Sequence, residues 1–172
     1  MKKAILIISI ICQVLVAQDL SEKPIYSISL KAIGNFLDNS GYHYEELTAS
    51  NRSGEIAERL HLSIRGENSI YDVNVQVFRE FDLIYMYIGQ YMDLQLEEES
   101  TLSMLAFLMS RNWELTIGEF EWDIRDGEVR FSIALPADDG ISERTFITYF
   151  NSMIKIADEL YPELNQTLES LK

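Results

Sequence analysis

Three stretches in the middle of the chain alternate apolar and polar residues with a period of two, and only short linkers separate them. A period of two places alternate side chains on opposite faces of a β-strand. Parallel neighbours need a crossover of a dozen or more residues, so linkers this short predict an antiparallel meander. The apolar members of the three stretches are Leu60, Leu62 and Ile64; Tyr71, Val73, Val75 and Val77; and Ile84, Met86 and Ile88.

A second alternating pair follows at residues 120–124 and 129–135, with Asp126 and Gly127 between the two runs. Asp-Gly between alternating runs is a strong signal for a two-residue hairpin, because glycine accepts the positive φ that a primed turn requires. The sequence therefore predicts two further antiparallel strands joined by a tight turn.

Apolar residues recur at helical spacing in three other segments. Residues 25–41 show this spacing and close on Gly41, a residue suited to the left-handed end of a helix. Residues 97–112 open with three glutamates, and their body is apolar on nearly every side, which predicts a buried helix. Residues 142–162 carry an apolar stripe behind a capping serine, and we expect Pro162 to end or kink that helix.

The predicted order is helix, three strands, helix, two strands, helix, with residues 42–47 as a short extended piece. This order predicts an α+β fold in which an antiparallel sheet of about five strands carries helices packed on one face. The length suits a single domain with a real core.

The N-terminus has the three parts of a secretory signal peptide. Two lysines follow Met1, an apolar run covers residues 4–16, and Ala17 supplies a small residue for cleavage. The run is shorter than the roughly 20 apolar residues that span a bilayer, although a short N-terminal membrane anchor is the alternative. We therefore predict a signal peptide at 1–17, a single domain at 18–172, no stable membrane insertion after cleavage, and a periplasmic or extracellular destination.

Cleavage would change the composition of the working domain. It removes Cys12, the single cysteine, and it removes Lys2 and Lys3, which shifts the net charge from −14 to −16. Such an acidic surface repels phosphate backbones and anionic lipids, which argues against nucleic acid and membrane surfaces as partners. It favours a basic or cationic protein partner, unless the charge serves solubility alone.

Few groups in the chain could carry catalysis. His43 and His61 lie in different predicted elements and match no metal-ligand motif. Glu119, Glu121 and Asp123 share one face of a predicted strand, where a solvated hairpin face is the simpler interpretation. The alternative is a small carboxylate-dependent enzyme of the glycosidase type. The sequence thus predicts no enzyme, no catalytic residues, no cofactor and no metal site.

The third predicted strand is apolar on both faces. Tyr85, Tyr87 and Tyr91 are expected to point away from the helices, beside Phe78 of the preceding strand. Exposed tyrosines add a large contact area with a polar tip, so these four residues are the candidate partner-binding residues. The alternative is that a second layer or loops of the same chain cover them.

Residues 102–164 contain an apolar helix, an acidic-Gly turn, a strand closing on Leu135-Pro136 and an acidic loop, one after another. The last helix ends in the pattern Ala157-Asp158-x-Leu160-x-Pro162. In these features the second half of the chain resembles the YbjN family, of which that pattern is typical. The family shares an α-βββ-α-ββ-α plan with type III secretion chaperones.

This resemblance implies a non-enzymatic binding module with a regulatory or chaperone-like role, which contacts another protein through the face or the edge of its sheet. Type III chaperones commonly pair, so the resemblance leaves a dimer open. Members of the YbjN family are mostly cytoplasmic, and the predicted signal peptide sets this chain apart from them.

Overall fold

The computed structural model of the chain describes residues 20–50 and 56–171, and the structural statements below concern those residues. They form three α-helices, six β-strands and one short 3-10 turn. The elements are α1 (Leu30–Asn39), β1 (Glu45–Ser50), β2 (Ile56–Arg65), β3 (Ile70–Phe78), η1 (Arg79–Phe81), β4 (Leu83–Asp93), α2 (Ser100–Glu114), β5 (Glu119–Trp122), β6 (Glu128–Pro136) and α3 (Glu143–Leu171). The predicted signal peptide, residues 1–17, lies outside the described residues.

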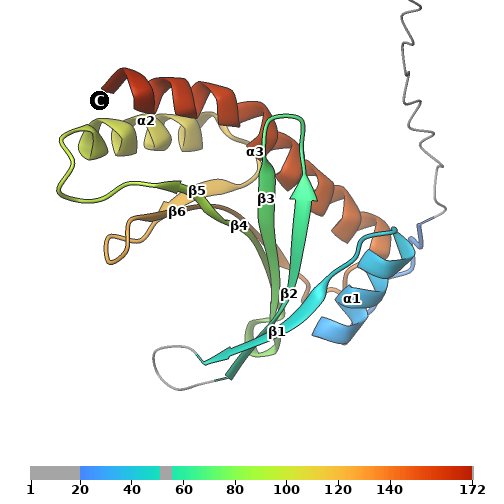
Figure 1. The fold of residues 1–172 in the computed structure, drawn as a ribbon. Coiled ribbons are helices and arrows are strands. Elements are labelled where there is room, and N and C mark those ends of the chain that lie inside the picture. Colours follow the sequence, from blue (N-terminus) through green and yellow to red (C-terminus); the bar gives the residue numbers. More distant parts are fainter. Residues whose placement is uncertain (1–19, 51–55, 172) are drawn as a thin grey trace, which may run out of the picture.

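All six strands belong to one antiparallel sheet in the order β1-β2-β3-β4-β6-β5. Figure 1 shows the three helices on one side of this twisted sheet. The chain therefore has the α+β fold that the sequence predicts. The strand added to the predicted five is β1, which overlaps the expected extended piece at 42–47 and pairs with β2 at the edge of the sheet.

The apolar members of each alternation face the helices and form the core. Leu60, Val73 and Met86 are buried on β2, β3 and β4, and Phe131 is buried on β6. They belong to the same core cluster as Phe150 of α3. The polar members of the alternation lie on the other face of the sheet, because successive side chains of a strand point to opposite faces. None of the helices in the described residues covers that face (Figure 1).

The first helix is shorter at its start than the apolar spacing predicts. Ser29 caps α1, because its hydroxyl accepts a hydrogen bond of 3.2 Å from the backbone N–H of Ala32. Ile25 lies before this cap and pairs with Ile141 as an isolated bridge. Gly41 follows the end of α1 with a φ of +78°, in the left-handed conformation that the sequence predicts.

The last helix is longer than predicted. α3 continues through Pro162 to Leu171, so this proline does not end the helix, which was one of the two outcomes expected for it. The apolar stripe continues beyond the proline: Leu164 is buried and Leu168 packs against the core, which holds this segment in place. Within the described ranges, no helix has the length and apolar character needed to cross a membrane.

The prediction that the second helix is buried is wrong. α2 buries Met104 and Leu108, but Leu102, Met109 and Trp113 are exposed. α2 lies at one end of the helix layer and contacts α3 and β5. A helix at the end of a layer is covered on one side, which sequence periodicity alone does not reveal.

The hairpin between β5 and β6 forms, but its loop is longer than two residues. The backbone N–H of Asp123 donates to the carbonyl of Glu128 at 2.9 Å, which leaves residues 124–127 as the loop. Gly127 has a φ of +78°, whereas Asp126 has no positive φ, and a type I′ turn requires one at both central residues. Gly127 therefore serves as the left-handed residue that closes a wider loop.

Candidate functional site

The face of the sheet that the helices leave uncovered, called the open face below, brings together side chains that are distant in the sequence. Strand pairing places Asn74 beside Tyr87, and Tyr87 beside Ser132. It also places Gln76 beside Tyr85. Further members of the same alternation on β2, β3, β5 and β6 are Arg59, His61, Asp72, Phe78, Glu121 and Arg130.

Three aromatic residues form a row across β3 and β4. The ring centroids of Phe78 and Tyr85 lie 6.5 Å apart, and those of Tyr85 and Tyr87 lie 5.3 Å apart. Phe78 is 37% exposed and Tyr85 is half-buried, whereas Tyr87 is only 6% exposed. The structure thus brings together three of the four predicted binding residues, and it covers one of them with neighbouring side chains.

Tyr85 is held by a carboxylate on β5. Its hydroxyl donates a hydrogen bond of 2.6 Å to Glu121 Oε2, while the Ser132 hydroxyl donates one of 2.8 Å to Glu121 Oε1. Burial raises the pKa of Tyr85 well above its usual value, and the hydrogen bond to Glu121 raises it further. Tyr85 therefore remains neutral, with its ring fixed in one orientation on the open face.

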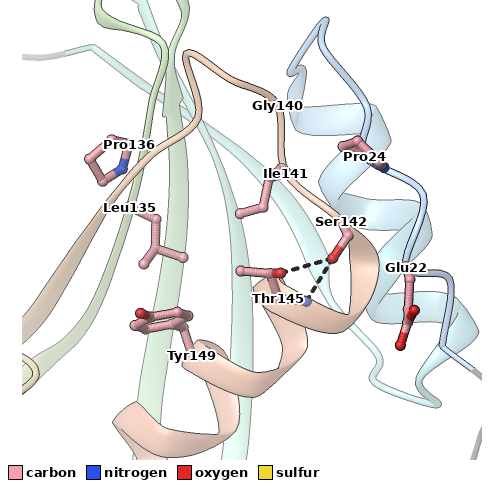
Figure 2. Close-up of a pocket in the computed structure, with 9 residues that line it drawn as sticks. All are labelled: Glu22, Pro24, Leu135, Pro136, Gly140, Ile141, Ser142, Thr145 and Tyr149. Atoms are coloured by element: carbon pink, nitrogen blue, oxygen red, sulfur yellow. Dashed lines mark hydrogen bonds between the residues drawn. The ribbon is translucent and has the colours of Figure 1, made fainter.

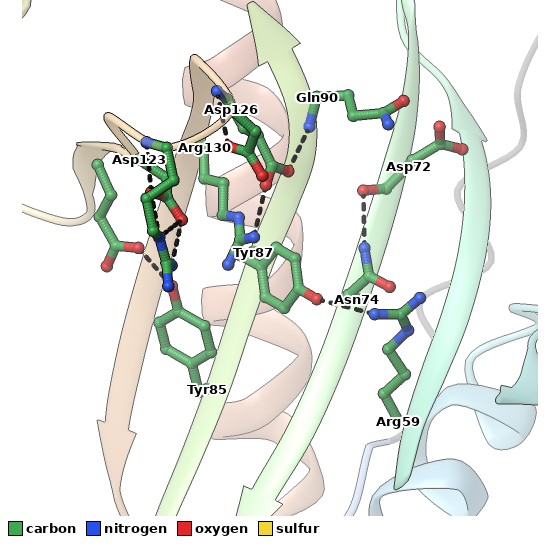
Figure 3. Close-up of polar contacts among 12 residues, drawn as sticks. Arg59, Asp72, Asn74, Tyr85, Tyr87, Gln90, Asp123, Asp126 and Arg130 are labelled. Carbon is green, nitrogen blue, oxygen red and sulfur yellow. Dashed lines mark hydrogen bonds and ion pairs between the residues drawn. The ribbon is translucent and has the colours of Figure 1, made fainter. Parts of the chain in front are cut away.

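Tyr87 lies between two arginines (Figure 3). The guanidinium carbon of Arg130 sits 4.9 Å from the centroid of the Tyr87 ring, a cation–π contact. From the other side, Arg59 Nη1 donates a hydrogen bond of 3.4 Å to the Tyr87 hydroxyl. The contact surface at this position therefore consists of the arginines more than of the tyrosine ring.

Arg130 is anchored in turn by Glu128, with which it forms an ion pair. The other oxygen of Glu128 accepts a hydrogen bond of 3.0 Å from the backbone N–H of Gln90. Burial alone would raise the pKa of Glu128, but the hydrogen bonds from Arg130 and Gln90 outweigh it and lower that pKa. Glu128 is thus held in its charged form.

Several polar atoms of the open face have no hydrogen-bond partner among the described residues. They are Asn74 Oδ1, Arg59 Nε and Arg130 Nε, and Asn74 is only 6% exposed. A buried polar group left unsatisfied costs about 1–3 kcal/mol. Hydrogen bonds from water or from a bound partner would recover part of this cost. A polar contact therefore contributes more binding free energy on the open face than on a surface whose polar atoms are all hydrogen-bonded.

Tyr91 does not share the open face, so the prediction that it lies beside Tyr85 and Tyr87 is wrong. The pairing of β4 with β6 shifts between Ile88 and Met92, and Gln90 has a φ of +49°. This bulge turns Tyr91 into the core, where its hydroxyl donates a hydrogen bond of 2.6 Å to the carbonyl of Ala157. A bulge adds one residue to a strand and reverses the alternation beyond it.

Three acidic residues near the hairpin, Glu121, Asp123 and Glu128, line one pocket together with two apolar side chains and both neighbouring arginines. Each carboxylate in it is engaged: Glu121 with Tyr85 and Ser132, Glu128 with Arg130, and Asp123 with Arg125. A glycosidase needs one carboxyl that keeps a proton near neutral pH, which requires a raised pKa. The lowered pKa of Glu128 is the opposite of that requirement.

The histidines show no arrangement for metal binding. His61 Nε2 lies 3.9 Å from Asp72 Oδ1 on the open face, and His43 is exposed ahead of β1. Within residues 20–50 and 56–171, no group of three or more His, Cys, Asp or Glu side chains could hold a metal ion.

A second pocket lies at the start of α3, between the end of β6 and the segment around Pro24 (Figure 2). Its Ser142 hydroxyl caps α3 by accepting a hydrogen bond of 3.1 Å from the backbone N–H of Thr145. Its Glu22 forms an ion pair of 3.3 Å with Arg144. Both polar groups have structural partners, so this pocket displays no nucleophile paired with a base.

The sequence alone does not predict that Arg59 and Arg130 belong to this site. Both occupy polar positions of alternating strands, the same phase that carries Tyr85 and Tyr87. Their meeting at Tyr87 depends on the strand order β2-β3-β4-β6, in which a strand from the second half of the chain joins the meander. The alternation gives the face of each residue, but it does not give the neighbouring strand.

Comparison with known proteins identifies similar chains. The model of the YbjN family, described as "Putative bacterial sensory transduction regulator", matches residues 29–166. The crystal structure of YbjN, a putative transcription regulator from E. coli, is similar with a TM-score of 0.65 and 14% identity, over 84% of this chain and 96% of that one. No curated protein sequence matches the chain.

Two complexes show a weaker likeness. A chain of the HopA1-SchA chaperone-effector complex has a TM-score of 0.46 and 8% identity, over 74% of this chain and 88% of that one. A chain of the ExsC-ExsE complex has a TM-score of 0.49 and 14% identity, over 83% of this chain and 97% of that one.

Proposed function

The chain belongs to the YbjN family, and we propose that it is a non-enzymatic binding module with a regulatory or chaperone-like role. We propose further that it is exported, on the signal-peptide pattern of residues 1–17. It engages another protein through the open face of its sheet. The observation that carries the proposal is the row of Phe78, Tyr85 and Tyr87 on the face without helices. Both tyrosine hydroxyls are hydrogen-bonded, and two arginines flank Tyr87.

The composition of this face supports protein binding. Aromatic residues and arginine dominate the energetics of protein interfaces, because they combine a large apolar area with hydrogen-bonding groups. The hydroxyl of Tyr85 is already fixed by Glu121, so little side-chain entropy is lost when a partner covers its ring. Phe78 supplies exposed apolar area at the end of the row.

Charge supports a basic partner at long range. The net charge of −14 attracts cationic proteins and speeds their encounter at low salt. At short range, Arg59 and Arg130 add hydrogen-bond donors for carbonyl or carboxylate oxygens of the same partner. A basic segment whose backbone carbonyls reach the arginines satisfies both requirements.

The test is affinity capture from the native exported fraction, with the Phe78→Ser and Tyr85→Ser double variant as the probe. Tyr87 is left unchanged in the variant because it is buried, so its replacement by serine would leave a cavity and lower the stability of the fold. The matched control is Tyr26→Ser, which removes an exposed tyrosine elsewhere in the chain. We expect the double variant to lose a reproducible partner that the control retains, at nearly unchanged melting temperature. Equal capture by both variants would overturn the proposal.

Export has its own test, because it depends on residues 1–17. N-terminal sequencing of the protein recovered outside the cytoplasm is expected to begin at Gln18. Recovery in the cytoplasm with Met1 intact would refute export while leaving the binding proposal standing. A chaperone-like role is distinguished by light scattering: it requires that stoichiometric protein suppress aggregation of the captured partner.

A further inference from the structure

One half-buried arginine of the described residues has no carboxylate partner. The half-buried arginines in those ranges are Arg59, Arg111 and Arg130. Arg111 and Arg130 each form ion pairs with glutamates, whereas Arg59 forms none within the described part of the chain. The chain has 28 acidic residues and 14 lysines and arginines, so a counter-ion is rarely far away. A charged group that is drawn out of water is normally paired, and the isolation of Arg59 therefore favours an anion from outside the chain.

The guanidinium of Arg59 has one edge free (Figure 3). Its Nη1 donates the 3.4 Å hydrogen bond to the Tyr87 hydroxyl, which is the only hydrogen bond of this group among the described residues. Its Nε is buried and has no partner there. Nε and Nη2 lie on the same edge of the guanidinium plane, and this edge matches the two oxygens of a carboxylate. A carboxylate that accepts a hydrogen bond from Nη2 is therefore positioned to accept one from the unsatisfied Nε.

Two carboxylates of the open face lie near this edge, but neither forms an ion pair with Arg59. In the pairing of β1 with β2, Glu45 lies opposite His61. Asp72 Oδ1 lies 3.9 Å from Nε2 of the same histidine. The described residues thus leave the free edge of Arg59 available to a ligand.

Apolar side chains lie next to Arg59 on the same face. Leu47 of the edge strand β1 lies directly opposite Arg59, and Ala57 precedes it by two residues on β2. Both side chains are half-buried. Phe78 is exposed on the open face of β3, the next strand of the sheet. A ligand whose carboxylate binds Arg59 therefore meets an apolar surface beside it.

We propose that Arg59 binds the C-terminal carboxylate of a protein partner whose last residue is apolar. The proposal rests on the proposed function of the open face, and it names the group of the partner that binds there. The two carboxylate oxygens accept hydrogen bonds from Nε and Nη2 of Arg59, while the last side chain packs on Leu47 and Ala57.

The spacing of these contacts favours a chain terminus over an internal acidic residue. Side chains directly opposite each other in an antiparallel pair, as Arg59 and Leu47 are, have Cβ atoms about 5 Å apart. A last residue carries its carboxylate and its side chain on one carbon atom, so both groups fit this spacing. In an extended internal segment, an acidic and an apolar side chain on the same face are separated by two residues, or about 7 Å.

The net charge of −14 also favours a chain terminus. A segment rich in acidic residues is repelled by so acidic a protein. A C-terminal carboxylate brings a single negative charge and can belong to a basic partner, which long-range attraction favours. The basic partner proposed for the open face and the carboxylate bound by Arg59 are therefore compatible.

The first test is an NMR titration of the purified, ¹⁵N-labelled protein with three short acetylated peptides. The first peptide ends in leucine with a free carboxylate, and the second has the same sequence with an amidated C-terminus. The third is amidated and carries a glutamate two residues before its leucine. We expect saturable shifts of the backbone N–H signals of Arg59 and Tyr87 with the first peptide, and affinities about tenfold or more weaker for the other two.

Three results of this titration would overturn the proposal. They are the absence of a saturable shift with the first peptide, an equal affinity for the second peptide, and an equal affinity for the third. The last result would assign the site to internal carboxylates. The titration uses no natural partner, so its failure is distinguishable from failure of the proposed function, which the capture experiment with Phe78 and Tyr85 measures separately.

The second test replaces the arginine. Arg59→Gln removes the charge and is expected to weaken binding of the first peptide by about tenfold or more. Arg59→Lys keeps the charge but not the two-pronged edge, so an intermediate affinity is expected. Arg65→Gln is the matched control, because Arg65 is an exposed arginine on the same strand and forms no ion pair within the described ranges. Equal weakening by the control would overturn the proposal, since surface charge alone would then explain the binding. Unchanged N–H signals outside the site verify that each variant is folded.

Discussion

Asp158 of α3 holds the turn between β2 and β3 to the helix layer, and its removal gives a sharp test of the fold. The side chain is 8% exposed and accepts three hydrogen bonds. They come from the backbone N–H of Glu67 at 2.9 Å, the backbone N–H of Asn68 at 3.0 Å and the Tyr71 hydroxyl at 2.7 Å. In addition, the side-chain amide of Asn68 donates a hydrogen bond of 2.9 Å to the backbone carbonyl of Asp158.

The expected cost of Asp158→Ala is about 3 kcal/mol in the free energy of unfolding. A hydrogen bond to a charged group contributes roughly 1.5–3 kcal/mol, but the two backbone donors are near the surface and can bind water after the substitution. The Tyr71 hydroxyl is buried and stays unsatisfied, which accounts for much of the loss. Tyr71→Phe removes one bond only and is expected to cost about 1 kcal/mol.

The pH dependence of this effect follows from the pKa of Asp158. Burial would raise that pKa, but hydrogen bonds from Asn68, Tyr71 and Glu67 outweigh burial and lower it. A lowered pKa in the folded state means that the stabilisation is present above the unfolded value of about 3.9. It is lost as the pH falls through the folded pKa, because the proton then binds the native state too.

Urea unfolding followed by circular dichroism measures both quantities. At pH 7 the midpoint of Asp158→Ala should fall at unchanged slope, and the difference from the native sequence should shrink below about pH 4. Asp158→Asn is the control, because it keeps the shape and one acceptor while removing the charge. If Asp158→Ala lowers the free energy of unfolding by less than about 1 kcal/mol at pH 7, the hydrogen bonds of Asp158 do not hold the turn as argued. A difference in free energy that stays constant down to acidic pH would refute the argument as well.

Three further substitutions test other parts of the structure. Gly66→Ala should destabilise the fold by more than about 1 kcal/mol, because a Cβ there would lie 2.8 Å from the Tyr71 ring and would overlap the Asp158 carboxylate; thermal unfolding measures it. Tyr91→Phe should lower the free energy of unfolding by about 1 kcal/mol, because it removes the hydrogen bond to Ala157, and it should leave partner capture intact. Urea unfolding and affinity capture of the same variant check the two expectations. Asn112→Ala should increase aggregation, which light scattering measures. The Asn112 amide donates a hydrogen bond to the carbonyl of Phe120 and accepts one from its N–H, so it occupies backbone groups that the edge strand β5 would otherwise offer to a strand of another molecule.

The sequence predicts the parts of this fold that depend on local periodicity. The alternation from Leu60 to Ile88 gives the faces of the strands correctly, because a buried face forces a period of two on every strand beside it. It fails at Tyr91, where the bulge after Gly89 reverses the phase. A glycine inside a strand pattern indicates a bulge. Gly89 is therefore the residue from which the sequence could predict that Tyr91 faces the core.

Properties that depend on tertiary neighbours were harder to predict. The apolar body of α2 predicts burial, but a helix at the end of a layer has one side with nothing to cover it, which leaves Trp113 exposed. The family pattern around Asp158 was recognisable in the sequence as a resemblance only. The physical reason for this pattern is that Asp158 holds the turn at Glu67 and Asn68 by hydrogen bonds. The sequence does not reveal these bonds, because 90 residues or more separate the partners.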